Sequence, residues 1–189
     1  MKNKIQSFFW GIFTAGVALF LELILASFFK VDYLDTANII FVIIMIASVI
    51  IEEVTKYIVI LKKIIFLSFG RNAIINAWIA GVGFYLVEIF IFYQKALMEN
   101  LDFNQIDLFK IGLLHILTFG IFGYRIAIKK DNKLDVGIVA IVVSLHFTYN
   151  ISSQYMGEAT YFVINLVLIA LVAYNIFGFF VVNKKLAHN

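Results

Sequence analysis

The sequence predicts an all-α polytopic membrane protein with about six transmembrane helices. Two observations support this prediction. Of the 189 residues, 63% are hydrophobic and only 14% are charged, and the mean hydropathy is +0.98, which is too apolar for a water-soluble surface. The chain also divides into about six apolar stretches of the roughly 20 residues that a helix needs to cross a bilayer. Because little sequence remains outside these stretches, we expect one transmembrane domain over residues 1–189.

The first half of the chain predicts three spans. Residues 7–29 form an apolar run that contains a single acid, Glu22. Residues 38–61 form a second run, whose charges gather in its second half. Residues 73–93 form the third, with Glu88 inside it. Each run is long enough to cross the hydrocarbon core as a helix.

The second half predicts three more spans. Residues 108–128 carry His115 near the middle of the run, and residues 134–152 carry His146. Residues 160–182 contain no Asp, Glu, Lys, Arg or His. These three runs complete the six predicted helices.

The charges between the spans predict the orientation. With an even number of spans, four basic clusters fall on one side of the membrane and most loop acids on the other. Since basic loops stay in the cytoplasm, both termini are predicted to be cytoplasmic, in a cell membrane. The first side has Lys2, Lys4, Lys62, Lys63, Arg71, Arg125, Lys129, Lys130, Lys133, Lys184 and Lys185, and the second has Lys30, Asp32, Asp35, Lys95, Glu99, Asp102, Asp107 and Glu158.

Composition also excludes several kinds of site. The chain has no Cys, so disulfides and thiolate chemistry are excluded, and a zinc site would need His and carboxylates alone. The net charge of +3 comes from basic clusters between apolar runs, a pattern that orients a membrane protein and does not indicate a nucleic-acid partner.

The second span holds the densest group of charges. Glu52 and Glu53 are adjacent, and Lys56 follows one turn later. At about 100° per residue, Lys56 projects between the two carboxylates and can balance one of them. Two carboxylates this close do not readily both ionise in a low dielectric, so we expect one to hold a proton near neutral pH. The structural alternative for Lys56 is a counter-ion that extends toward the inner interface.

Three further spans place ionisable groups at similar depth, in the outer half of the membrane. Glu88 shares a helical stripe with Gly81, which permits close approach of a neighbouring helix, so Glu88 is expected to face the bundle. His146 shares a face with Asn150, and a histidine beside an amide can stabilise an oxyanion or bind a metal. His115 lies on the span between them.

Each of these groups has a structural explanation when taken alone. A single intramembrane Glu or His is often a hydrogen-bond partner between helices, and a packing or accessory role is expected for Glu22, which has no motif around it. A charge at mid-bilayer costs roughly 3 to 15 kcal/mol unless it is paired, neutralised or hydrated. Three carboxylates and two imidazoles at similar depth therefore favour one shared functional site.

The order of these groups along the chain resembles the PrsW family of intramembrane proteases. That family is related to the CAAX prenyl protease and bacteriocin-processing (CPBP) membrane proteins and to the gamma-secretase scaffold subunit. The resemblance covers roughly residues 40–155. It rests on Glu52-Glu53-x-x-Lys56, Phe84-x-x-x-Glu88, the isolated His115 and His146-x-x-x-Asn150.

The resemblance implies an enzyme that hydrolyses peptide bonds of a membrane-anchored protein substrate within the bilayer, with an anti-sigma factor cleaved at its extracytoplasmic side as one such substrate. The CAAX branch has His at the position of Glu88 and Arg one residue beyond Lys56, so the sequence favours the PrsW branch. The implied catalytic residues are Glu52, Glu53, Glu88, His115 and His146, and the implied supporting residues are Lys56, Asn150 and Phe84.

The sequence leaves two questions open. Hydrolysis can use a water activated by Glu52 or Glu53 without a cofactor, or a Zn²⁺ ion with Glu88, His115 and His146 as candidate ligands. No His-Glu-x-x-His signature is present, so the metal-free form is preferred. Buried acids and histidines also build proton-coupled transporters, and a non-catalytic scaffold or immunity protein is a further alternative.

Overall fold

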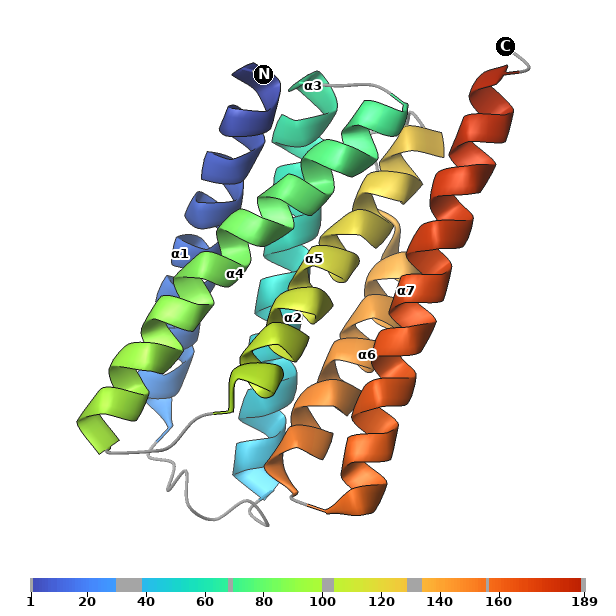
Figure 1. Ribbon diagram of the computed structural model, residues 1–189. Coiled ribbons are helices and arrows are strands. Elements are labelled where there is room, and N and C mark those ends of the chain that lie inside the picture. The colour runs from blue at the N-terminus through green and yellow to red at the C-terminus, as the bar shows by residue number, and fades with distance from the viewer. Residues whose placement is uncertain are drawn as a thin grey trace.

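The protein is a bundle of long helices that run side by side (Figure 1). The computed structural model describes residues 2–29, 39–67, 70–99, 104–128, 134–155 and 157–187, and all regular structure in these ranges is helical. The all-α prediction is therefore confirmed. The elements are α1 (Lys2–Phe28), α2 (Ile39–Val59), the π-helical turn η1 (Ile60–Ile64), α3 (Ile65–Leu67), α4 (Arg71–Glu99), α5 (Gln105–Ile128), α6 (Val136–Gln154) and α7 (Glu158–Ala187).

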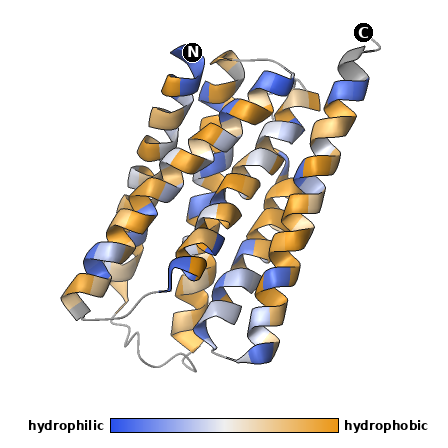
Figure 2. Cartoon of the chain, viewed as in Figure 1, coloured by the Kyte–Doolittle hydropathy of each residue, from blue (hydrophilic) through white to orange (hydrophobic). Residues whose placement is uncertain are grey.

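The bundle has the surface of a membrane protein. Within the described ranges, α1, α4, α5, α6 and α7 are long and apolar enough to cross a bilayer. Their outer faces are largely hydrophobic (Figure 2) and expose large side chains such as Phe20, Phe90 and Ile169. The helix of the second predicted span, α2, lies among them but carries three charges within its 21 residues. The count of six spans therefore remains a prediction.

The helices extend beyond most of the predicted spans. The second span was expected to stop at residue 61, whereas α2 continues through η1 and α3 to Leu67. Lys62 and Lys63 in this extension are exposed. A helix can continue into the polar interface, since its backbone hydrogen bonds do not depend on apolar side chains, whereas hydropathy marks only the part in hydrocarbon.

The predicted orientation is only partly covered by the structure. The start of α1 and the end of α7 lie at the same end of the bundle (Figure 1), as an even number of crossings requires. Residue 38 of the second predicted span lies outside the described residues. So do seven of the charges used to orient the chain, namely Lys30, Asp32, Asp35, Asp102, Lys129, Lys130 and Lys133.

Small residues bring α4 very close to its two neighbours. A Cβ atom on Gly11 of α1 would overlap the backbone carbonyl of Ala80 in α4. On the other side of α4, a Cβ on Gly81 would lie 2.7 Å from the Cα of Ile116 in α5. The close approach predicted at Gly81 is therefore confirmed, and it places Glu88 of α4 beside α5.

Polar contacts at the end of the bundle that holds both termini fix the start of α6. Asp135 caps this helix by accepting a hydrogen bond from the backbone N–H of Ile138 at 3.3 Å. The same carboxylate pairs with Arg125 of α5. The backbone N–H of Asp135 donates to the hydroxyl of Tyr57 in α2 at 3.1 Å. These contacts tie α2, α5 and α6 together and fix the register of α6.

Candidate active site

Six ionisable side chains from four helices meet inside the bundle. The structure brings together all five residues that the sequence named as catalytic, together with Lys56. All but Glu88 are buried: relative exposure is 0% for Glu53 and Lys56, 2% for both histidines and 8% for Glu52. The group consists of Glu52, Glu53 and Lys56 from α2, Glu88 from α4, His115 from α5 and His146 from α6.

Lys56 lies at the centre of this group. Its Nζ donates to Oε1 of Glu53 at 2.7 Å and lies 3.5 Å from Oε2 of Glu52, so one ammonium serves both carboxylates, as the spacing on the helix predicts. The ammonium also donates to Nδ1 of His115 at 2.7 Å. It lies 4.4 Å from the ring centroid of Phe84, a cation–π distance.

His115 is fixed through both ring nitrogens. An ammonium can only donate, so Nδ1 must accept the hydrogen bond from Lys56, which leaves the ring proton on Nε2. Nε2 is in close contact with Oε2 of Glu88. Glu88 therefore orients the imidazole from α4, at the place where Gly81 lets the two helices approach.

His146 distinguishes the two adjacent acids of α2. Its Nδ1 lies 2.6 Å from Oε1 of Glu53, so the ring donates to this carboxylate. The other nitrogen, Nε2, lies 4.0 Å from Oε2 of Glu52. Glu53 thus accepts from His146 and Lys56, while Oε2 of Glu52 is buried without a hydrogen-bond partner among the described residues.

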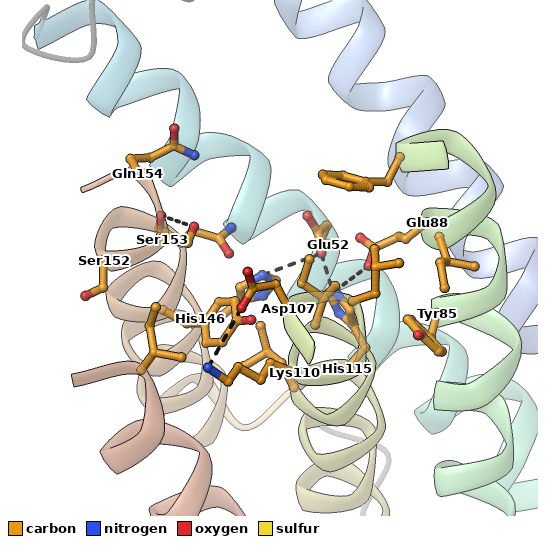
Figure 3. A pocket seen from close by; sticks show the side chains of 18 of the residues that line it. Glu52, Tyr85, Glu88, Asp107, Lys110, His115, His146, Ser152, Ser153 and Gln154 are labelled. Atoms are coloured by element: carbon orange, nitrogen blue, oxygen red, sulfur yellow. Dashed lines mark hydrogen bonds and ion pairs between the residues drawn. The ribbon is translucent and has the colours of Figure 1, made fainter. Parts of the chain in front are cut away.

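A cavity of about 530 Å³ gives access to this group. Glu52, Glu88, His115 and His146 line it and face one another (Figure 3), whereas Glu53 is not among its lining residues. Asn150, expected as a supporting residue, also lines it. The cavity continues past Lys110 and Ser153 to the end of the bundle where α4 and α6 end and α5 and α7 begin.

Sequence reasoning missed two residues of the cavity wall. Glu22 of α1, expected to have a packing or accessory role, lines the cavity near Glu52. Tyr149 of α6 lines it as well and is 4% exposed. A signal for Tyr149 was present, because residues three apart share a helix face and Tyr149 follows His146 by three. For Glu22 the only signal was its being a lone acid in an apolar helix.

Four of the buried groups could hold a metal ion. Glu52, Glu53, His115 and His146 each offer one ligand atom, and these atoms lie within 4.8 Å of one another. Two imidazoles and two carboxylates are a donor set that suits zinc. One oxygen of each carboxylate is buried without a hydrogen-bond partner in the described part of the chain. The residues therefore fit a metal, provided that Lys56 shares or releases its three partners in this group, which are Glu52, Glu53 and His115.

The candidate ligands differ from those expected. The sequence named Glu88 with the two histidines, but Glu88 lies outside the four-residue group and contacts His115 instead. The difference arises because α2 points its two acids toward α5 and α6. Estimating the depth of each residue in its own span could not show this direction.

One comparison with known proteins identifies a relationship. A family model described as PrsW family intramembrane metalloprotease matches residues 2–175. This range includes every residue that meets in the cavity described above. No curated protein and no solved structure matches the chain.

Proposed function

The chain belongs to the PrsW family of intramembrane metalloproteases, and we propose that its buried cluster hydrolyses peptide bonds of a membrane-anchored protein substrate. The protein is accordingly a multi-pass membrane protein and an intramembrane protease. The observation that carries the site assignment is the convergence of Glu52, Glu53, His115 and His146 within 4.8 Å. We take residues 1–189 to form one transmembrane protease domain.

Glu52 is the group that activates water. Peptide hydrolysis needs a base for the attacking water and an acid for the leaving amine. Glu52 lines the cavity, and its Oε2 has no hydrogen-bond partner among the described residues, so this oxygen is available to a water. Glu52 takes a proton from the water as it attacks the peptide carbon and returns it to the nitrogen of the leaving amine.

Glu53 and Lys56 orient the groups around Glu52. Glu53 is fully buried and accepts from His146 Nδ1 at 2.6 Å, which leaves Nε2 of this histidine on the side of Glu52. The amide of Asn150, which lines the cavity with His146, donates to the oxyanion of the tetrahedral intermediate. The unprotonated Nε2 of His146 is left to accept from the water or to bind a metal ion. The ammonium of Lys56 offsets the charge of the two adjacent carboxylates.

The family description and the donor set favour the metal-dependent form over the metal-free form that the sequence alone preferred. A zinc-class ion held by Glu53, His115 and His146 would polarise the water and the substrate carbonyl and would leave Glu52 beside it as the base. Glu88 supports this site through its close contact with Nε2 of His115, which fixes the orientation of the ring.

The position of the cavity suggests where the substrate is cut. The cavity reaches the end of the bundle where Asp107 and Glu158 lie, opposite the end that holds basic residues such as Lys4, Arg125 and Lys184. By the positive-inside rule this end is extracytoplasmic and both termini are cytoplasmic, in the cell membrane. A protein with a single membrane span, cut in the outer half of that span, fits this geometry, and an anti-sigma factor is one candidate.

Co-expression with a single-span reporter, tagged at both ends, tests the function. Glu52→Gln should abolish appearance of the cut fragments while the protease remains in the membrane at the wild-type level. Glu53→Gln should also abolish it, with cleavage measured per amount of protease in the membrane. Glu158→Gln is the matched control, because this acid is exposed at the first turn of α7 and is not among the cavity-lining residues. Unchanged cleavage by Glu52→Gln would refute the proposal.

A further inference from the structure

The active-site cavity carries carboxylates at its inner end and lysines toward its mouth. Glu52 and Glu88 line the inner end, and Lys110 lines the wall near the end of the bundle where α5 begins. Lys95, which also lines the cavity, is an exposed residue. The inner carboxylates repel an acidic residue of a substrate, so the mouth is the part of the cavity that favours one.

Lys110 is a largely buried lysine whose charge is weakly paired. Its side chain is 16% exposed, and Nζ lies 3.8 Å from Oδ1 of Asp107, one turn earlier on α5 (Figure 3). That distance is too long for a hydrogen bond, and the Asp107 side chain is 46% exposed, so water screens the pair. The ammonium makes no hydrogen bond to another described residue. It therefore keeps its capacity to bind a second anion.

Tyr161 of α7 holds this ammonium in the cavity wall. The centroid of its ring lies 5.2 Å from Nζ of Lys110, a cation–π distance. Because Tyr161 also lines the cavity, the contact keeps the ammonium there, where a free lysine would extend into the water beyond the bundle. The ring face replaces none of the three N–H donors of the ammonium, which stay available to a carboxylate.

The spacing along α5 gives the distance from Lys110 to the reacting groups. His115 follows Lys110 by five residues, which is about 7.5 Å along the helix axis. An extended peptide advances about 3.3 Å per residue, so this distance corresponds to two or three residues of a substrate. Side chains on a helix lean toward its N-terminus, and for α5 this direction leads to the cavity mouth.

We propose that Lys110 selects the peptide bond that is cut by binding an acidic side chain of the substrate. The acidic residue lies two or three positions from the cut bond, on the side of the cavity mouth. Its contact with Lys110 fixes the register of the substrate against Glu52. The inference rests on the proposed function and adds a preferred residue to its substrate class.

Paired substrates that differ in one residue test the proposal. Purified protease in detergent cleaves single-span substrates that carry Asp or Asn two or three residues from the cut bond mapped by mass spectrometry. For wild type, kcat/KM should favour Asp by about tenfold, the scale of a charge-assisted hydrogen bond at a partly exposed site. Moving the Asp by one residue should move the cut bond by one residue.

Variants of the cavity mouth should change this preference in opposite directions. Lys110→Gln should remove it and Lys110→Glu should reverse it, so that a substrate with Lys at this position is cleaved faster than one with Asp. Asp107→Asn should increase it, because Asp107 competes for the ammonium. Lys62→Gln is the matched control: this lysine is exposed and lies outside the cavity lining, so the preference should stay tenfold.

Two results would overturn the proposal, namely wild-type cleavage without an Asp preference and an Asp preference that survives Lys110→Gln. Each ratio is measured within one variant, so partial misfolding lowers both rates and leaves the ratio unchanged. If Lys110→Gln slows both substrates equally and only in micelles with phosphatidylglycerol, the ammonium binds a lipid headgroup and the proposal is wrong.

The same assay separates this proposal from the proposed function. Cleavage by Glu52→Gln at the wild-type rate would refute the proposed function itself. An active wild type and an inactive Glu52→Gln, with equal cleavage of the Asp and Asn substrates, would refute only the role of Lys110.

Discussion

Glu53 and Lys56 form a buried ion pair, so the losses of stability caused by substituting each partner should be strongly non-additive. Both side chains are 0% exposed, and Nζ lies 2.7 Å from Oε1. Removing one partner of such a pair leaves an uncompensated charge and costs about 3–5 kcal/mol. Because Lys56 keeps Glu52 at 3.5 Å, we expect the lower value, about 3 kcal/mol, for Glu53→Gln, and a similar loss for Lys56→Met.

The double variant should be much less destabilised than either single variant. In Glu53→Gln/Lys56→Met only Glu52 loses an ion-pair partner, and this side chain lines the cavity, where water can solvate it. The Gln oxygen still accepts from Nδ1 of His146, so a loss of about 1 kcal/mol is expected. Unfolding by a denaturing detergent, followed by circular dichroism in micelles, gives the four free energies. Glu158→Gln should stay within about 0.5 kcal/mol of wild type. If the double variant loses the sum of the two single losses, the pair is not coupled and the described geometry is wrong.

Three further predictions follow from the packing, the orientation and the donor set. Gly11→Ala should lower the free energy of unfolding by about 1–3 kcal/mol, because its Cβ would meet the backbone of α4. Gly16→Ala, with open space at that position, should be near neutral. Equal losses for the two variants in the same detergent assay would contradict the packing of α1 on α4. Since the chain has no Cys, single-cysteine variants report on which side of the membrane a residue lies. A membrane-impermeant thiol reagent should label Ser153→Cys on intact cells and Lys184→Cys only after lysis. The reverse labelling would show that the predicted orientation is wrong. Lys56→Met should bind Zn²⁺ about tenfold more tightly in a chelator competition, because the lysine ammonium no longer competes for three of the four donors. Weaker binding would mean that Lys56 and the ion do not compete.

The fold could be predicted because each helix depends on a continuous stretch of the sequence. Apolar runs of about 20 residues mark the membrane-crossing parts without knowledge of their neighbours. The same local reasoning placed Lys56 between Glu52 and Glu53, since three residues on one helix have a fixed angular relationship. The continuation of α2 to Leu67 could not be predicted. The apolar run ends at the charged Lys62, and hydropathy does not show that the π-helical turn η1 carries the helix past it.

The contacts between helices could not be predicted from the sequence. Depth counting placed Glu88, His115 and His146 in the same half of the membrane, but it could not show that Glu88 contacts His115 while His146 contacts Glu53. Helix rotation decides these pairs, and rotation depends on packing at positions such as Gly81. The same limit explains why Glu22 was assigned to packing, because nothing in α1 itself indicates which neighbour it faces.

The central claim is that the cavity between α2, α4, α5 and α6 hydrolyses a substrate inside the membrane. Purified protein and a single-span substrate, incorporated in liposomes with Zn²⁺ in H₂¹⁸O, test it through mass spectrometry of the products. We predict one ¹⁸O atom in the new carboxyl terminus, a cut in the half of the substrate span nearest the cavity mouth, and no product with Glu52→Gln. A fragment without ¹⁸O, or equal product from Glu52→Gln, would contradict the claim.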